Sequence, residues 1–393
     1  MNFTMNMKIT LPCHFGMEAV LKRELRDLGY EPYEVTDGRV SVMGDARAVC
    51  DINIRITTAE RVLIDMGEFS AATFEELYQG IRGIAWEEYL PGDARFWVTK
   101  AGSTDSKLTA IPSIQAVAKK AMVERMGAHY GMNVFPEDGD SYPVRIFLRK
   151  DMASVYLDTS GAPLHKRGYR ARTAAAPIAE TLAQAIILLS PWHPDRILMD
   201  PFCGSGTFAI EAAMRAAKIA PGLKREFTAE KWQMVTPQRL WDLCRHEAKE
   251  RVDRSVKTQI FGSDIDPAMI RTARANATEA GVAELITFEN KPVSKISSAE
   301  SYGFIITNPP YGERLSNDDT LPGIYKDLGE SFSRLKEWSM YMISGYEQAE
   351  KYINRKATKK RKLYNGMLRT TLYQYMGAKP SGNKPDYKKE EIR

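Results

Sequence analysis

Cysteine, histidine and long apolar runs are scarce in this 393-residue sequence. Its four cysteines, Cys13, Cys50, Cys203 and Cys244, stand far apart and form no C-x-x-C pair, so neither a disulfide framework nor a cysteine metal site is predicted. No apolar run approaches the ~20 residues that cross a bilayer. The N-terminus also lacks the basic flank and apolar stretch of a signal peptide. We therefore expect a cytoplasmic protein without a metal, in which a catalytic cysteine is an alternative that no neighbouring base supports.

The composition is that of an ordinary globular protein, with 44% hydrophobic and 27% charged residues, and the length allows two or three domains. Its net charge of +5 is unevenly placed: residues 351–393 hold 13 Lys and Arg against 3 Asp and Glu, and the rest holds 42 basic against 47 acidic residues. Such a concentration predicts contact with phosphates, although a solvated face is the alternative. We call its central part the basic stretch: Arg355, Lys356, Lys359, Lys360, Arg361 and Lys362.

The hydrophobic pattern divides the chain into two parts. Residues 1–160 mix strands and helices without strict alternation, including a hairpin over 142–160 that turns near Lys150 and Asp151, which is an α+β pattern. From about residue 177 the pattern becomes strand, loop and helix in repetition, which predicts a mostly parallel, doubly wound sheet. The boundary falls near 160–176, a basic segment rich in small residues, and residues 381–393 look disordered.

A glycine loop follows a strand at 196–214, RILMDPFCGSGTFAIEAAM. The strand ends in Asp200, and Gly204 and Gly206 allow a tight turn that approaches a ligand at the carboxyl edge of a sheet. A P-loop lacks support because its lysine and spacing are absent, and a dinucleotide fingerprint would need a third glycine. A cofactor loop is therefore predicted, with an ordinary strand-to-helix turn as the alternative.

An acidic strand end follows about sixty residues later, in IFGSDIDP at 260–267. A carboxylate in this place can accept both ribose hydroxyls of a nucleoside, and we assign that role to Asp264. Asp266 is instead expected to cap the next helix, which begins at Pro267. A solvated acidic turn is the alternative for both.

The most specific motif is Asn308-Pro309-Pro310-Tyr311, at the end of the apolar strand in YGFIITNPPYGERL. Two prolines fix the turn, so that the Asn308 amide oxygen and the Pro309 carbonyl can act as rigid acceptors for the N–H bonds of an exocyclic base amine. These acceptors would stabilise positive charge on the nitrogen as it attacks a methyl donor. Tyr311 would stack on a base swung out of its strand. Because glycine loop, acidic strand end and N-P-P-Y appear in this order, a plain proline turn is disfavoured.

These three segments resemble class I S-adenosylmethionine-dependent methyltransferases that act on amino groups. The segment YLDTSGAPLHKRGYRARTAAAPIAETLAQAIILLSPW, 156–192, resembles the bridge of THUMP-containing ribosomal RNA guanine-N2 methyltransferases, whose members are also labelled N6-adenine-specific DNA methylases. GMEAVLKRELRDLGY and FSAATFEELYQGIRGIAWEEYLP in the first half, and KLYNGMLRTTLYQYM near the end, extend the resemblance over nearly the whole chain.

The resemblance implies a domain order and a set of site residues. The expected domains are a ferredoxin-like subdomain at 1–55, THUMP at 56–160, a Rossmann-like methyltransferase domain at 161–380 and a basic tail at 381–393. Asn308, Pro309, Pro310 and Tyr311 would be catalytic. The cofactor S-adenosylmethionine would contact Asp200, Phe202, Gly204, Gly206, Thr207, Asp264, Ile265 and Asn290. Asn290 stands where the family usually has an acidic residue for the adenine amine, which is a departure.

The expected partner is 23S ribosomal RNA or its precursor. RNA contacts are predicted for Lys100, Lys107, Lys166, Arg167, Arg170, Arg361 and Lys362. Three other functions stay open: a transfer-RNA guanine-N2 methyltransferase, an N6-adenine methylase of DNA or RNA, and a ribosome-assembly protein that only binds RNA.

Overall fold

The computed structural model describes residues 6–132, 134–170, 177–311 and 320–380, which form two compact units. The first unit takes in the described residues up to 170 together with 179–189 and 214–256. The second takes in 177–178, 190–213, 257–311 and 320–380. The predicted tail at 381–393 lies outside the described residues. Within them, no helix has the length and apolar character needed to cross a membrane.

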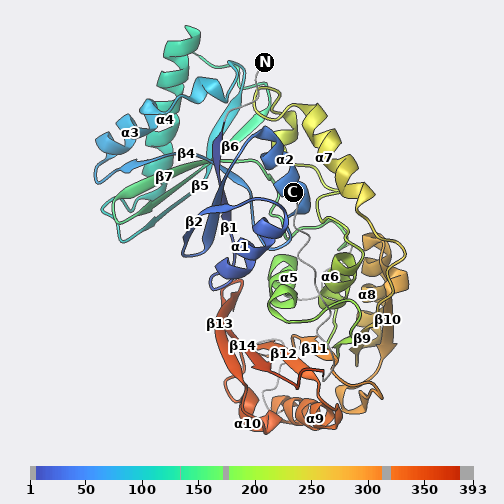
Figure 1. Cartoon of the computed structure of the whole chain (residues 1–393). Helices are drawn as coiled ribbons and strands as arrows, with labels where there is room; N and C mark the ends of the chain where they lie inside the picture. The colour runs from blue at the N-terminus through green and yellow to red at the C-terminus, as the bar shows by residue number, and fades with distance from the viewer. Residues whose placement is uncertain (1–5, 133, 171–176, 312–319, 381–393) are drawn as a thin grey trace. The chain divides into compact units, whose positions relative to one another are not determined.

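A seven-stranded mixed sheet forms the centre of the first unit, in the order β2-β3-β1-β4-β7-β6-β5 (Figure 1). Its neighbouring strands run antiparallel except for the parallel pair β5 and β6. The strands are β1 (Met7–Pro12), β2 (Pro32–Thr36), β3 (Arg39–Gly44), β4 (Leu63–Ser70), β5 (Arg95–Thr104), β6 (Ser141–Arg149) and β7 (Met152–Asp158). The predicted hairpin is confirmed, because Lys150 and Asp151 join β6 to β7 with φ of 52° and 58°.

Six α-helices of the described residues belong wholly to the first unit. Thr73 begins one of them, its side chain accepting a hydrogen bond from the Glu76 backbone N–H. The helices are α1 (Glu18–Asp27), α2 (Ala46–Arg55), α3 (Phe74–Gly83), α4 (Ile111–Tyr130), α5 (Glu180–Leu189) and α7 (Gln238–Glu250), with the 3-10 helices η1 (Trp86–Glu88) and η2 (Thr228–Lys231).

Residues from the second half of the chain complete the core of the first unit. Trp232 stacks on Tyr142 with ring centroids 4.8 Å apart and donates its indole N–H to the Ser141 carbonyl at 2.8 Å. Phe227 stacks on the buried Trp241 of α7, which packs against α2. Sequence periodicity did not predict this arrangement, because it does not report contacts between distant residues such as Trp232 and Ser141, which are 91 positions apart.

The second unit is built on a seven-stranded sheet in the order β10-β9-β8-β11-β12-β14-β13 (Figure 1). The first five strands are parallel and the last two are antiparallel, which confirms the doubly wound, mostly parallel fold. The strands are β8 (Leu198–Asp200), β9 (Ile260–Asp264), β10 (Ile286–Asn290), β11 (Phe304–Thr307), β12 (Ser339–Ser344), β13 (Lys359–Asn365) and β14 (Leu368–Tyr375).

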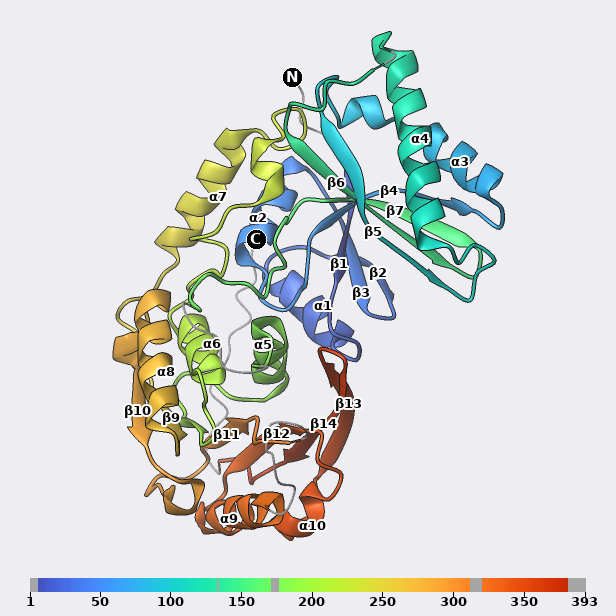
Figure 2. The same ribbon diagram turned by 180° about the vertical axis from the view of Figure 1, so that it is seen from behind.

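Helices cover this second sheet on its two faces. One face carries α8 (Pro267–Ala280) and the beginning of α6 (Thr207–Ala216); the other carries α9 (Leu321–Arg334) and α10 (Ala349–Ile353) (Figure 2). The β10-to-β11 connection contains only the 3-10 helix η4 (Val293–Lys295), and η3 (Ala283–Leu285) precedes β10. In this topology the carboxyl ends of β8, β9, β10 and β11 meet at one edge, where ligands of doubly wound folds bind.

Candidate functional site

The glycine loop lies between Asp200 at the end of β8 and Thr207 at the start of α6. Gly204 and Gly206 have φ of 50° and 88°, a region that side chains other than glycine rarely adopt. A Cβ on Gly204 would meet no atom within 4 Å, so the backbone there borders open space. A Cβ on Gly206 would lie 3.1 Å from the Ala273 side chain. The backbone at Gly204 is thus open to close approach, and Gly206 is needed for close packing on α8.

Two side chains from other elements hold this loop. The Asp264 carboxylate at the end of β9 accepts a hydrogen bond from the Gly204 backbone N–H at 2.9 Å. The buried Asn276 of α8 donates its amide N–H to the Ser205 carbonyl at 3.0 Å. These two hydrogen bonds fix the loop in its turn, as a preorganised binding site requires. Asn276 was not singled out in the sequence, where it is one of several polar residues on a helix.

Asp200 is buried at the end of β8, with 2% of its surface exposed. It accepts hydrogen bonds from the Thr307 hydroxyl at 2.6 Å and the Phe202 backbone N–H at 3.3 Å. Burial raises the pKa of the Asp200 carboxyl to about 7, against the opposite effect of the two hydrogen bonds. Thr307, which no sequence motif identified, ties the glycine loop to the strand that precedes N-P-P-Y.

The two carboxylates after β9 have different contacts. Asp264 accepts hydrogen bonds from the backbone N–H groups of Gly204 and Asp266, and burial raises the pKa of its carboxyl. The Asp266 side chain accepts from the Ala268 backbone N–H at 2.7 Å and caps α8, as the sequence predicts. Ile265 is 75% exposed between them, an apolar surface at the strand end.

Asn290 ends β10 beside this acidic turn. Its amide nitrogen donates to the backbone carbonyls of Asp264 and Ile265 at 2.8 and 2.9 Å. Neither of these two hydrogen bonds involves its amide oxygen. The following Lys291 pairs with Glu289 at 3.2 Å. Because alternate residues of a strand face opposite ways, Glu289 and Lys291 lie on the other side of the strand from Asn290.

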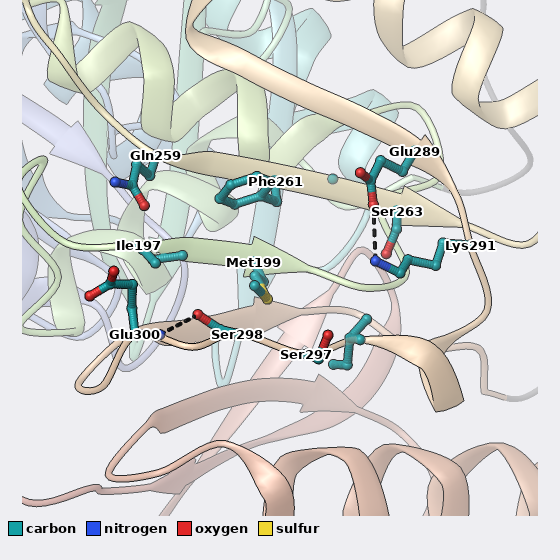
Figure 3. A pocket seen from close by; sticks show the side chains of 12 residues that line it. Ile197, Met199, Gln259, Phe261, Ser263, Glu289, Lys291, Ser297, Ser298 and Glu300 are labelled. Carbon is teal, nitrogen blue, oxygen red and sulfur yellow. Dashed lines mark hydrogen bonds and ion pairs between the residues drawn. The ribbon is translucent and has the colours of Figure 1, made fainter.

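Glu289 and Lys291 line a separate cavity of about 310 Å³ against β8 and β9 (Figure 3). Ile197, Met199 and Phe261 also line it. It lies beside the connection from β10 to β11, which contains the 3-10 helix η4 and no α-helix. The cavity contains neither the glycine loop nor the N-P-P-Y turn, and no motif in the sequence predicted it.

Asn308 lies directly after β11, at the same edge of the sheet as Asp200. Its amide oxygen Oδ1 is buried and has no hydrogen-bond partner within the described part of the chain. An unsatisfied buried acceptor costs ~1–3 kcal/mol and is rare in folded proteins. The observation fits a site that receives a donor from a ligand. The next turn is held by the Tyr325 hydroxyl of α9, which donates to the Pro310 carbonyl at 3.2 Å.

Tyr311 is buried, with 3% of its surface exposed. The Asn365 side chain at the end of β13 donates a hydrogen bond to its hydroxyl at 3.1 Å. A Cβ on Gly345 would lie 2.8 Å from the ring, so Gly345 provides the space that the ring occupies. A base that stacks on this ring must therefore displace what covers it. Asn365 is a further residue of the site that the sequence did not identify.

The cysteines offer no reactive thiol near this site. Cys203, in the glycine loop, is buried, and burial raises the pKa of its thiol well above the ordinary value. A thiolate is the nucleophilic form, so this thiol is inert at neutral pH. Among the described residues, no group of three or more His, Cys, Asp or Glu could hold a metal ion.

The residues predicted to contact RNA differ in exposure. Arg167 is buried and donates to the Leu164 and Thr57 carbonyls, and Arg170 pairs with the buried Glu180 at 3.1 Å. Both guanidinium groups thus act within the first unit, which argues against a phosphate contact for either. Exposed side chains are Lys100, Lys107 and Lys166, and also Lys362 on β13, beside the half-buried Arg361.

Three family models match the chain. Residues 167–374 match the RMKL-like methyltransferase domain, 8–63 match the RlmL ferredoxin-like domain, and 71–158 match the THUMP domain.

Relatives of known name match over nearly the full length. The curated Bacillus subtilis protein "Putative RNA methyltransferase YpsC" is 43% identical over 96% of both chains. The crystal structure of SMU.472, titled "a putative methyltransferase complexed with SAH", is 42% identical, with a TM-score of 0.90 over 96% of this chain and 99% of that chain. A Listeria monocytogenes structure, titled "a predicted N6-adenine-specific DNA methylase", is 41% identical, with a TM-score of 0.89 over 95% and 97%.

Proposed function

Since the chain belongs to the family of RMKL-like methyltransferases that carry RlmL ferredoxin-like and THUMP domains, and thus to the S-adenosylmethionine-dependent RNA methyltransferases, we propose that it methylates guanine N2 of 23S ribosomal RNA. The observation that carries the amino-group chemistry is the buried, unpartnered Oδ1 of Asn308 at the carboxyl edge of the sheet, among the residues that the structure describes.

The chain's own residues fit the cofactor at this edge. When bound, S-adenosylmethionine supplies a methyl group on a positively charged sulfur. Gly204 leaves space for close approach, and the Asp264 carboxylate stands at the end of β9, where it would accept from the ribose. The exposed Ile265 and the Asn290 amide oxygen would hold the adenine and its amine. Asp200, Phe202 and Thr207 would line the methionine part.

Asn308 would act on the nucleophile. Its Oδ1 accepts one N–H of the exocyclic amine and the Pro309 carbonyl accepts the other, which orients the nitrogen lone pair out of the ring plane. The same two acceptors stabilise the positive charge that develops on nitrogen during attack. A proton then leaves the methylated nitrogen to water, since the cationic nitrogen is strongly acidic and needs no base of high pKa. Tyr325 and Asn365 hold the turn and the Tyr311 ring in place.

Support for a ribosomal substrate comes from sequence resemblance rather than from the site. Adenine N6 and guanine N2 both present two N–H donors to the same acceptors, so Asn308 does not discriminate between them. The bridge DTSGAPLHKRGYR, at 158–170, and the THUMP-matching region are similar to those of ribosomal guanine enzymes. The name of the Listeria structure keeps N6-adenine DNA methylation as a second candidate.

Nucleoside mass spectrometry tests the proposal. Ribosomal RNA, transfer RNA and DNA are separated from cells with and without the gene and digested to nucleosides. We expect N2-methylguanosine to fall in large-subunit ribosomal RNA alone, and to return with the unaltered gene but not with Asn308→Ala. A decrease confined to a transfer-RNA guanosine or to N6-methyladenosine would refute the assignment of the substrate. No change in any fraction would favour a protein that only binds RNA.

A further inference from the structure

The β13–β14 hairpin carries exposed apolar side chains at its tip. Its strands pair from Lys359 with Gln374 to Asn365 with Leu368, and the two-residue turn between them is Gly366 and Met367. Gly366 has φ of 63°, as the first central position of a hairpin turn requires. Met367 is 97% exposed, Leu368 53% and Tyr364 47%. The hairpin forms one edge of the second sheet (Figure 2), and its turn presents three large apolar groups to solvent.

The sheet register places this tip at the edge where Asn308 lies. β14 pairs antiparallel with β12, and Thr371 lies opposite Ser344, the last residue of β12. Leu368 therefore stands three residues beyond that edge, which at ~3.3 Å per residue is ~10 Å. Because β11 and β12 are parallel, this is also the edge at which Asn308 follows β11. The Asn365 hydrogen bond to the Tyr311 hydroxyl joins the hairpin directly to the N-P-P-Y turn.

Basic side chains lie along the hairpin on both sides of its tip. Alternate residues of β13 share a face, so Lys360, Lys362 and Tyr364 lie on one side of this edge strand, and all three are exposed. Arg369, exposed as well, pairs with Tyr364 across the hairpin. An apolar tip with basic flanks suits a phosphate backbone beside a stack of bases. A stable protein interface buries ~800 Å² on each partner, more than three side chains at one turn supply.

We propose that the hairpin tip, Tyr364–Leu368, is a wedge that enters the RNA base stack beside the target nucleotide and holds it open while the flipped base occupies the site at Asn308. The inference rests on the proposed RNA methylation and adds how a structured target is opened. Apolar side chains inserted between bases are an established means of unstacking nucleic acid, and a base inside a helix cannot reach a methyl donor. Met367 and Leu368 would enter the stack, with Tyr364 behind them.

The test compares structured and unstructured forms of one RNA. Ribosomal RNA from cells that lack the enzyme is either refolded with magnesium or cut into short single strands, and initial rates are measured at saturating S-adenosylmethionine. The double variant Met367→Ser, Leu368→Ser removes the wedge. Met367→Leu keeps its apolar volume, and Met376→Ser is the matched control at the other end of β14, where Met376 is 46% exposed. Equal thermal unfolding midpoints establish that each variant is folded.

We expect the rate of the double variant to fall ~10-fold or more on refolded RNA and less than ~2-fold on single strands, because only the first needs unstacking. Met367→Leu and Met376→Ser should retain both rates. An equal decrease on both RNAs would refute the wedge and assign the tip to the reaction site. An unchanged rate on both would also refute it and leave the tip to a protein partner. If the unaltered chain methylates neither RNA, the proposed function itself is wrong, and the wedge falls with it.

Discussion

At the scale of single residues, the site combines a glycine loop held by hydrogen bonds with an unsatisfied acceptor at the turn that follows β11. Asp264 and Asn276 hold the glycine loop through its backbone, whereas the Asn308 Oδ1 has no partner within the described residues. The Asn276 Oδ1 also has no partner there, but it lies on α8 behind the loop, whereas Asn308 follows the strand end where the substrate is expected. The different surroundings of these residues predict different kinetic defects when each is changed.

Asn308→Ala should lower turnover by ~10²–10³ and leave cofactor affinity nearly unchanged, as expected when one transition-state partner is removed. Asn290→Ala is the matched control, since both are asparagines at strand ends of the same sheet. It should weaken cofactor binding and change turnover little. Single-turnover rates and calorimetry measure the two effects. Full turnover in Asn308→Ala would exclude this residue as the amine acceptor.

Asp264→Ala should weaken cofactor binding, because it removes the expected ribose acceptor and the carboxylate that holds the Gly204 N–H. Asp266→Ala should keep its affinity and reduce stability by only ~1 kcal/mol, the usual cost of removing a helix cap. Calorimetric titration with S-adenosylhomocysteine compares the two. If Asp266→Ala shows the larger decrease in affinity, the ribose role moves to Asp266.

The raised pKa of the Asp200 carboxyl predicts that cofactor binding releases a proton. The pKa of its carboxyl is about 7, so near pH 6.5 a large fraction is protonated in the free protein. A positively charged cofactor beside it favours the ionised form and lowers the pKa, so binding releases a proton. The release should vanish near pH 8.5, where the carboxyl is already ionised.

Calorimetry in two buffers of different ionisation enthalpy measures this release, and Asp200→Asn corrects for protons from the cofactor itself. Near pH 6.5, we expect the unaltered protein to release a sizeable fraction of a proton more than Asp200→Asn when the cofactor binds. Equal proton release in both would contradict the role of Asp200.

At the scale of elements, the lysines of the edge strand β13 differ in whether an acidic side chain pairs with them. Lys359, Lys360 and Lys362 are all exposed, but Lys360 pairs with Glu350 at 2.7 Å, which also raises the pKa of Lys360. A charge already paired with a carboxylate contributes less to binding a polyanion. The strand thus offers matched lysines for testing RNA binding.

Changing Lys359 and Lys362 to alanine should weaken RNA binding and reduce its salt dependence, by ~0.7 in the logarithmic slope for each RNA phosphate that is no longer neutralised. Lys360→Ala should change the slope less. Filter binding to ribosomal RNA across a range of salt concentrations measures both. A slope unchanged by the double variant would make the basic stretch a solvated face.

At the scale of the whole molecule, the first unit depends on residues that are distant in sequence. Trp232 is fully buried and stacks on Tyr142 of β6. Removing such a side chain leaves a cavity in the core and deprives the Ser141 carbonyl of the indole donor. The stability of the N-terminal sheet should therefore depend on a residue well beyond the THUMP-matching region.

Trp232→Ala should lower the free energy of unfolding of the first unit by ~3–5 kcal/mol. Trp97→Ala, at a position 39% exposed on β5, should cost about 1 kcal/mol or less. Urea denaturation followed by circular dichroism compares the two variants. Equal shifts would contradict the packing of 214–256 into the first unit.

The sequence by itself determined the doubly wound sheet and the order of its chemical motifs. Glycine and proline dictate the backbone at Gly204, Gly206 and N-P-P-Y, and parallel topology brings the ends of these strands to one edge. Asp266 and Thr73 were predictable as caps because capping is a local interaction. The hypothesis of amino-group chemistry followed from these local rules, whereas the family followed from a resemblance over nearly the whole chain.

Only the tertiary structure decided which side chains meet across the chain. Thr307 reaches Asp200 from 107 positions away and Asn365 reaches Tyr311 from 54. In the sequence, Arg167 cannot be distinguished from the other basic residues of the linker, whereas in the structure it is buried and donates to two backbone carbonyls. Periodicity and turn chemistry encode the conformation of neighbouring residues, whereas these interactions depend on the order of strands in a sheet and on the packing of distant segments, which no local pattern specifies.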